Sequence, residues 1–558
     1  MGYISHVIVI LKRIELSIHV VFVKKEHGMD TGLMRFLLLG IITLAIITTG
    51  FFFFKSPSTK QPIIPKILEW LTQEKEWFNV SRPLHAADLH NRILIVDFWT
   101  AGCINCMHVM PELAALEHQF KEKITVIGVH SGKFLSEHVD QTIKQAIKRH
   151  NIIHPVVNDK NFVIWKAFDV NSWPTLMVIN PGGHIYKEYQ GEKHQEEIAR
   201  DIKELLARFP QATTTPLPLK SEVSNSTQSL LSFPGKLAYA DDFKGSPALF
   251  ISDSGNNHII VSQLDGKIIQ TIGSGIQGFA DGNLQTAQFN WPQGLLWDQE
   301  NRVLYVADTK NHMLRKVDFD LNTVTRLAGT GTRGTHSVTT KDTPRDVALA
   351  SPWDLAFFPV APIIAIAQAG THQIWLYEQG KNRLRILTGN GREGIKDGQH
   401  PYATMAQPSG LATVEDTLYI VDAESSALRM FRGHDLKTLV GKGLFNFGFT
   451  SGKAEDAQLQ HPQGIAADKD AVYIADTYNH SIRLYNPNTQ ELSTLIGNGT
   501  AGSNLGIFDQ TQLNEPNGMV KIGNRLYLAD TNNHRIVVAD LDTHECSKLV
   551  LFENKTST

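Results

Sequence analysis

The pattern of apolar and polar positions divides the chain into three parts. Residues 36–54 are apolar throughout, apolar strands then alternate with amphipathic helices to about residue 209, and short apolar strands recur beyond it. Strands that alternate with helices are typical of an α/β domain, and many short strands separated by turns are typical of an all-β domain. We therefore predict an α/β domain at residues 70–209, a linker at 210–227 and an all-β domain at 228–558.

The N-terminal segment predicts a membrane anchor. Residues 36–54 carry no charge, and at about 1.5 Å per residue they can cross a hydrocarbon core of about 30 Å. No small-residue cleavage site follows them, so we predict an uncleaved signal anchor after an extension at 1–35 and before a stalk at 55–69. The lysines and arginines that precede the segment favour an inside N-terminus. We expect the domains to face the periplasm or cell exterior, anchored in a bacterial inner membrane.

A pair of cysteines marks the candidate chemistry. An apolar run at residues 92–98 is followed by Cys103 and Cys106 in a C-x-x-C motif, and a helical pattern then extends to about residue 120. This layout places Cys103 at a helix N-terminus, where the helix dipole stabilises a thiolate. Thiol–disulfide exchange needs such a thiolate and a second thiol close by. A zinc site is the alternative, but it needs two more ligands, and the one other cysteine, Cys546, is remote in sequence.

These motifs, together with a Trp-Pro-Thr segment before an apolar strand at 176–179, resemble thioredoxin-like proteins. The resemblance covers residues 70–209, and the insert at about 132–159 is similar to that of membrane-anchored TlpA-like proteins. It implies that Cys103 is the attacking nucleophile and Cys106 the resolving thiol, while Asp97 accepts the resolving thiol's proton. It also implies that Trp99 packs beside the site and that Pro174 is a cis-proline.

The all-β part is built from six repeats. Each begins with a proline, mostly as Pro-x-Gly, followed by an apolar strand that mostly ends in Asp, a turn that often contains Asn-His, and another strand. The six prolines are Pro234, Pro292, Pro352, Pro408, Pro462 and Pro516. Units this small cannot bury their own apolar faces, so they must stack around a ring, which predicts a six-bladed propeller with four strands per blade. The repeats resemble NHL repeats.

The aspartate of each repeat invites a metal or catalytic interpretation, but a residue that recurs at the same turn is better explained as holding that turn through backbone N–H groups. The aspartates are Asp253, Asp308, Asp422, Asp476 and Asp530, and Gln368 takes the place in the third repeat. A metal-dependent propeller enzyme remains an alternative, although no acidic cluster lies outside the repeat positions. We expect no cofactor and no metal.

Composition and domain pairing narrow the function. The formal net charge is −3, which argues against nucleic acid as the main partner because such binding needs a basic face. A thioredoxin-like domain joined to six NHL repeats resembles the family of NHL-repeat-containing protein 2. We predict a membrane-anchored thiol–disulfide oxidoreductase whose propeller binds protein substrates or redox partner proteins. The alternative is a redox-inactive scaffold in which the propeller binds partners and the thioredoxin fold is structural.

Overall fold

The computed structural model describes residues 64–212, 214–222, 229–335, 343–359 and 362–553. The extension and apolar segment predicted from the N-terminal sequence, and the stalk up to residue 63, lie outside these ranges. In the part of the chain that the structure describes, none of the helices has the length and apolarity needed to cross a membrane. Pro65–Thr558 form one compact unit, which contains a thioredoxin-like α/β domain followed by a six-bladed propeller.

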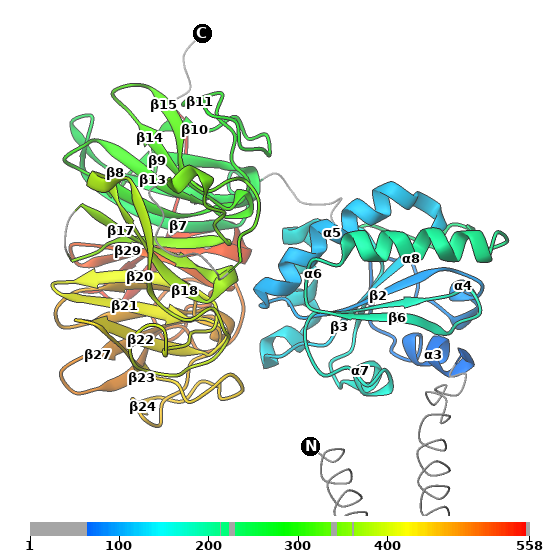
Figure 1. Ribbon diagram of the computed structural model, residues 1–558. Coiled ribbons are helices and arrows are strands. Elements are labelled where there is room, and N and C mark those ends of the chain that lie inside the picture. The colour runs from blue at the N-terminus through cyan, green and yellow to red at the C-terminus, as the bar shows by residue number, and fades with distance from the viewer. Residues whose placement is uncertain (1–63, 213, 223–228, 336–342, 360–361, 554–558) are drawn as a thin grey trace, which may run out of the picture. The chain divides into compact units, whose positions relative to one another are not determined.

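The α/β domain is a six-stranded sheet of order β1-β4-β3-β2-β5-β6, flanked by helices (Figure 1). The strands are β1 (Trp77–Phe78), β2 (Leu94–Trp99), β3 (Thr125–His130), β4 (Val156–Asn158), β5 (Thr175–Ile179) and β6 (Ile185–Gln190). The helices are α3 (Ile64–Leu71), α4 (Ala86–Leu89), α5 (Ile104–Phe120), α6 (Asp140–His150), α7 (Val163–Ala167) and α8 (Gln195–Arg208), with short 3-10 turns η1 (Lys121–Lys123) and η2 (Leu135–His138).

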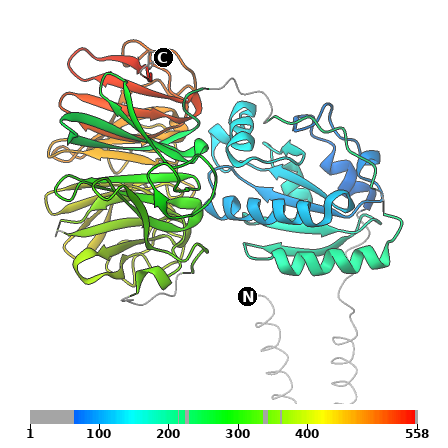
Figure 2. The ribbon, with the colours of Figure 1, turned by 90° about the horizontal axis from the view of Figure 1, so that it is seen from above.

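The central strand β2 explains the apolar run before the cysteines. It pairs with β3 in parallel and with β5 in antiparallel register, and all six of its residues are buried. A strand covered on both faces is apolar at nearly every position, and in β2 the exception is Asp97. Leu113 of α5 and Ile202 of α8 belong to the same apolar cluster as Ile95 of β2, and Figure 2 shows both helices beside the sheet. The strand thus ends in a rigid core directly before the C-x-x-C turn.

Each repeat forms one blade, an antiparallel sheet whose four long strands pair in chain order. The blades are β7 (Pro234–Phe243), β8 (Ser246–Asp253), β9 (His258–Gln263), β10 (Ile268–Ile272); β12 (Pro292–Asp298), β13 (Val303–Asp308), β14 (Met313–Asp318), β15 (Thr323–Ala328); β16 (Pro352–Phe357), β17 (Ile363–Gln368), β18 (Gln373–Glu378), β19 (Arg383–Thr388); β20 (Pro408–Val414), β21 (Thr417–Asp422), β22 (Ala427–Arg432), β23 (Asp435–Val440); β25 (Gly464–Ala467), β26 (Val472–Asp476), β27 (Ser481–Asn486), β28 (Glu491–Ile496); and β29 (Pro516–Ile522), β30 (Arg525–Asp530), β31 (Arg535–Asp540), β32 (Glu545–Leu549). Two short strands, β11 (Gly282–Asn283) and β24 (Gly452–Lys453), extend the second and fifth blades. The predicted six-bladed propeller is therefore confirmed.

Two features close the ring. The first blade's β7 packs beside β29 of the last blade, and the C-terminal tail pairs with the first blade, where the Ile268 N–H donates to the Phe552 carbonyl at 2.8 Å.

The glycine of the Pro-x-Gly motif allows the innermost strands to approach closely. A Cβ added at Gly464 would lie 1.6 Å from the Asn517 carbonyl oxygen of the next blade, so only glycine fits there.

The repeat aspartates hold their turns, as the sequence analysis expected. Asp476 is fully buried and accepts hydrogen bonds from the Gln460 N–H at 2.7 Å, from Asn479 Nδ2 at 2.7 Å and from Arg483 Nη1 at 3.1 Å. Arginines pair with the equivalent aspartates in three other blades, as Arg315, Arg429 and Arg535. These arginines, which bind the repeat aspartate in four of the six blades, were not evident from the repeat pattern.

The recurring histidines join neighbouring blades. In four blades, His Nδ1 accepts a hydrogen bond from the backbone N–H of the residue that precedes the next repeat's proline, at 3.0 to 3.2 Å: His312 to Ser351, His372 to Gln407, His480 to Glu515 and His534 to Phe233. Accepting this bond requires an unprotonated Nδ1. Burial favours that form, since it lowers the pKa of His312 to about 3. These residues are structural, and their bonds orient the pre-proline residues of the ring.

Candidate active site at the domain interface

The two cysteines lie at the turn between β2 and α5. Cys103 is the N-cap residue of α5, and its Sγ accepts a hydrogen bond from the Cys106 N–H at 3.2 Å. Both cysteines are free thiols; Cys103 is partly exposed and Cys106 is buried. An N-cap position directs backbone N–H groups at the sulfur and places it in the positive end of the helix dipole, so the thiolate is favoured there. The predicted placement of Cys103 at a helix N-terminus agrees with this geometry.

A buried carboxyl lies near the buried thiol. Asp97 on β2 is 2% exposed, and its Oδ1 has no hydrogen-bond partner among the described residues. Burial raises the pKa of Asp97 to about 7, partly offset by His154. Burial also raises the pKa of the Cys106 thiol, and the charges of Cys103 and Asp97 add to the increase. A carboxyl whose pKa is near neutrality can exchange a proton with a neighbouring thiol at physiological pH.

The remaining predicted site residues frame the thiols. Trp99 is buried and meets His130 edge to face at 4.6 Å between ring centroids. The Trp173–Pro174 peptide bond is cis and directly precedes β5. Trp99, Cys106, Cys103 and Trp173 share one apolar cluster. The described residues hold no group of three or more His, Cys, Asp or Glu that could bind a metal ion, so the zinc alternative lacks a ligand set there.

The propeller contacts the cysteine turn directly through Gln407. Gln407 is fully buried; its Oε1 accepts the Ile104 N–H at 2.9 Å, and its Nε2 donates to the Gly102 carbonyl at 3.0 Å. The two bonded residues flank Cys103 on either side. A single propeller side chain therefore fixes the backbone that carries the candidate nucleophile.

Gln407 is one of six equivalent residues, each directly before a repeat proline, which we call the pre-proline ring. All six have a positive φ: Phe233, Trp291, Ser351, Gln407, His461 and Glu515. Every member contacts the thioredoxin-like domain: Phe233 lies under the Arg149 guanidinium, Trp291 stacks on His150, Ser351 bonds His108 at 2.7 Å, His461 packs on Phe134, and Glu515 pairs with Arg149. The ring is thus the docking surface for the domain that carries the cysteines.

A buried glutamate from the insert also supports the turn. Glu137 on η2 accepts hydrogen bonds from the Gly102 N–H at 2.7 Å and from Thr100 Oγ1 at 2.6 Å. The Tyr478 hydroxyl of the propeller donates to the same carboxyl at 3.3 Å. Burial raises the pKa of Glu137 to about 7. Glu137 therefore links the insert, the cysteine turn and the propeller, a role that the sequence analysis missed.

The fold and site define a thioredoxin-like domain that docks on an NHL propeller through its C-x-x-C turn. A thioredoxin-like family model matches residues 91–185, and an NHL repeat model matches residues 459–485. The chain belongs to the family of NHL repeat-containing protein 2. It is 37% identical to the chicken (Gallus gallus) protein of that name over 526 residues, which cover 87% of this chain and 72% of the relative.

Two further relatives match this chain over different shares of their length. Protein SUPPRESSOR OF QUENCHING 1, chloroplastic, from Arabidopsis thaliana is 40% identical over 525 residues, 90% of this chain but 48% of that protein. The chain thus spans about half the length of the plant relative. The thiol-disulfide oxidoreductase ResA of Bacillus thuringiensis is 26% identical over 124 residues, 22% of this chain and 69% of the relative.

The predicted location at a bacterial inner membrane is corrected by these findings. Two relatives that match most of this chain are a plant protein named as chloroplastic and a vertebrate protein. The spanning segment on which the prediction rested lies outside the described residues. That prediction came from the apolar pattern of residues 36–54 and their flanking charges alone, and neither feature identifies an organism or a compartment.

Proposed function

We propose that this protein is a thiol–disulfide oxidoreductase that uses Cys103 and Cys106. The observation that carries the proposal is the N-cap position of Cys103, whose Sγ accepts the Cys106 N–H at 3.2 Å. The buried carboxyl of Asp97 near Cys106 and the similarity to a relative named as a thiol-disulfide oxidoreductase support it. Burying the Asp97 Oδ1 without a hydrogen-bond partner is costly, which favours a chemical role for this carboxyl.

The exchange would proceed in two steps. The Cys103 thiolate attacks one sulfur of a substrate disulfide, forms a mixed disulfide and releases the first substrate thiolate. Cys106 then loses its proton to Asp97 and attacks Cys103 Sγ, which expels the second substrate thiolate and forms the Cys103–Cys106 disulfide. The substrate gains two electrons, the cysteine pair loses two, and the released thiolates take up protons from Asp97 and solvent. The opposite direction follows the same steps in reverse.

We propose that the propeller positions the cysteine turn and contributes the surface that binds protein partners. Gln407 and His461 pack on the turn itself, the latter so closely that a Cβ at Gly102 would lie 2.9 Å from its Cε1. A large substrate therefore needs the turn to separate from the pre-proline ring before it can reach Cys103.

A redox titration tests the proposal. The protein with Cys546→Ser as background is equilibrated in glutathione buffers, and the disulfide fraction of the remaining pair is measured by mass spectrometry after alkylation. We expect a reversible two-electron couple between roughly −300 and −100 mV, the span of thioredoxin-like catalysts. Cys103→Ser abolishes exchange, and Cys106→Ser accumulates mixed disulfides. A pair that never forms a disulfide in any buffer contradicts the proposal.

The contacts of the cysteine turn with the propeller, on either side of Cys103, also favour the second candidate, a redox-inactive interaction scaffold. In that case the contacts of the turn with Gln407 serve only to dock the two domains. The Cys103→Ser variant separates the two candidates because a scaffold retains its partner binding and its cellular role without the thiol, whereas an oxidoreductase loses them.

A further inference from the structure

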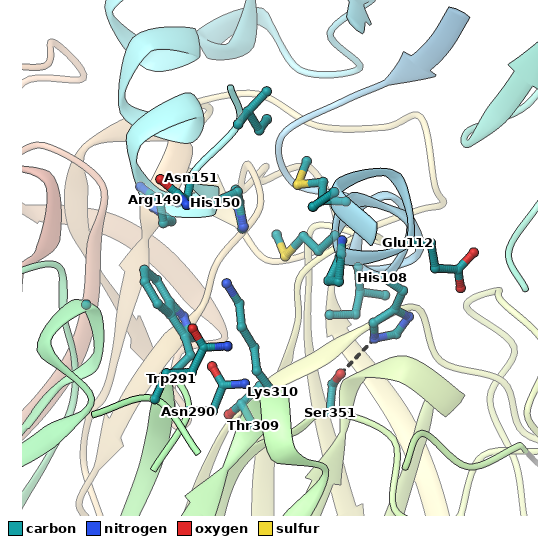
Figure 3. Close-up of a pocket in the computed structure, with 18 of the residues that line it drawn as sticks. His108, Glu112, Arg149, His150, Asn151, Asn290, Trp291, Thr309, Lys310 and Ser351 are labelled. Carbon is teal, nitrogen blue, oxygen red and sulfur yellow. Dashed lines mark hydrogen bonds between the residues drawn. The ribbon is translucent and has the colours of Figure 1, made fainter. Parts of the chain in front are cut away.

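A cavity of about 810 Å³ lies beside the cysteine turn, between the thioredoxin-like domain and the propeller. Helices α5 and α6 line one side, and the pre-proline residues Phe233, Trp291 and Ser351 line the other. Figure 3 shows the cavity with residues of α5 and α6 above and propeller residues below. Its size is that of sites that enclose small organic molecules. Neither cysteine lines it, so the cavity is distinct from the candidate redox centre.

The charge of the lining is strongly positive. Five lysines and arginines line the cavity but only two acidic residues, Glu112 and Glu117. Both glutamates already have a partner: Glu112 lies 4.0 Å from Arg333, and Glu117 contacts the His154 ring at 3.3 Å. Glu192, outside the lining, also pairs with Arg333. The cavity thus has an excess of positive charge that its own acidic residues do not balance.

Lys310 is one of the cations that contribute to this excess. Its ammonium lies 4.5 Å from the ring centroid of Trp291, and no carboxylate among the described residues lies within ion-pair distance of it. Burial lowers the pKa of Lys310 to about 8, and the charge of Arg149 adds to the decrease. Arg149 itself is paired with Glu515. Lys310, like Lys148 and Lys193 of the same lining, has no ion-pair partner among the described residues, and it is the one that lies against Trp291.

A second polar group points at the same space. His150 on α6 stacks on Trp291 with an interplanar angle of 28°, and its buried Nε2 has no hydrogen-bond partner in the part of the chain that is described. In Figure 3 the side chains of His150 and Lys310 extend from opposite walls into one gap beside Trp291. Burial and the nearby charges of Lys310 and Arg149 lower the pKa of His150, so it is neutral there, and a neutral imidazole can donate one hydrogen bond.

A buried imidazole nitrogen without a partner costs folding free energy, and a lysine ammonium without a counter-charge beside it is free to bind an anion. An anion between them would accept a charge-assisted bond from Lys310 and a hydrogen bond from His150. Met107 and Met110 of α5 also line the cavity and offer adaptable apolar surface for the rest of a ligand. We propose that this cavity binds a small organic anion, with its carboxylate or phosphate group between Lys310 and His150 and its apolar part against Met107 and Met110.

The test is calorimetric titration of the full chain with phenyl phosphate, benzoate and inorganic phosphate. Lys310→Met keeps the apolar stem and removes the charge, and the matched control is Lys316→Met, a lysine of the same blade that pairs with Asp318 outside the cavity. We expect the unmodified protein and the control to bind at least one probe equally. Lys310→Met should weaken that binding by about tenfold or more, because it loses a hydrogen bond from a charged group.

The pH dependence provides a second readout. The charged and titratable groups that line the cavity with Lys310 come from both domains: His108, Glu112 and Glu117 of α5, Lys148, Arg149 and His150 of α6, His154 and Lys193 beyond them, and His312 and Arg333 of the propeller. Lys310 is charged below its pKa of about 8, so binding should weaken as pH rises through 8, and this dependence should disappear in Lys310→Met. Should that variant fail to fold, His150→Gln replaces it and should weaken binding as well. Absence of binding to all three probes, or equal binding by the control and Lys310→Met, overturns the proposal.

Discussion

Substitution of Gln407 by alanine tests whether the propeller restrains the candidate nucleophile. Gln407 makes two hydrogen bonds to the cysteine turn, at 2.9 and 3.0 Å, through its side chain. Its backbone N–H bonds His372 Nδ1 at 3.1 Å, and alanine keeps this bond. The substitution therefore removes the link to the turn and leaves the connection between the blades in place.

The size of the effect follows from those two bonds. Each neutral hydrogen bond contributes a net 0.5–1.5 kcal/mol, so their loss favours separation of the turn by about 1–3 kcal/mol. The Ile104 N–H and the Gly102 carbonyl would then be buried without partners in the docked state, which adds to the same effect. At about 1.4 kcal/mol per factor of ten, the fraction of molecules with a separated turn rises roughly 5- to 150-fold.

Alkylation of Cys103 measures that fraction. The reduced protein, with Cys546→Ser as background, is treated with a polymer-bearing maleimide, and the modified fraction is followed by mass. When opening and closing are fast, the rate is proportional to the population of the open form. Gln293→Ala is the matched control, because Gln293 is a buried glutamine whose amide bonds Ser254 within the propeller. Equal alkylation rates in Gln407→Ala and in the unsubstituted protein would refute a restraining role for the propeller.

Two further predictions concern single carboxyls. Asp476→Ala should lower the free energy of unfolding by about 3–5 kcal/mol, because it leaves the buried Arg483 without its ion-pair partner. Chemical denaturation measures this loss, with substitution of the exposed Asp470 by alanine as the control. Lost thiol exchange at unchanged stability would contradict a structural role for Asp476. Asp97→Asn should slow the resolution of mixed disulfides and remove a rise in rate with pH centred near 7, where Asp97 ionises and can accept a proton. Stopped-flow exchange with a small disulfide between pH 5 and 9 checks this, and an unchanged profile would exclude Asp97 as the proton acceptor.

The fold could be predicted because its determinants are local or periodic. The run that became β2, the cysteines at the start of α5 and the six recurring prolines each carry their signal within a few residues. The buried arginines were harder to find. Arg483 lies seven residues after Asp476 on the neighbouring strand, and nothing in a strand pattern of alternating side chains distinguishes an arginine that turns inward from one at the surface.

The interface could not be predicted because its residues have no type in common. The pre-proline ring contains an aromatic, an amide, an acid and a hydroxyl at equivalent positions, for example Trp291, Gln407, Glu515 and Ser351. Each side chain contacts a different group of the thioredoxin-like domain. A search for recurring residue types passes over such positions. The signal that could have found these residues is a position directly before the recurring proline of every repeat, at which the residue type changes from copy to copy.

The position of the thiols within this interface has a thermodynamic consequence for the proposed redox pair. In the described state both cysteines are free thiols while Gln407 bonds the residues on either side of Cys103. Closing a disulfide pulls Cys103 toward Cys106, and the N–H and carbonyl that Gln407 bonds belong to the same short turn. Binding and redox equilibria are linked reciprocally. If oxidation weakens the docking of the cysteine turn on the propeller, docking therefore stabilises the dithiol over the disulfide by the same free energy. For a two-electron couple, about 1.4 kcal/mol of such coupling raises the reduction potential by about 30 mV. Under the proposed function, we therefore expect the propeller to shift the reduction potential of the cysteine pair through the docking equilibrium alone.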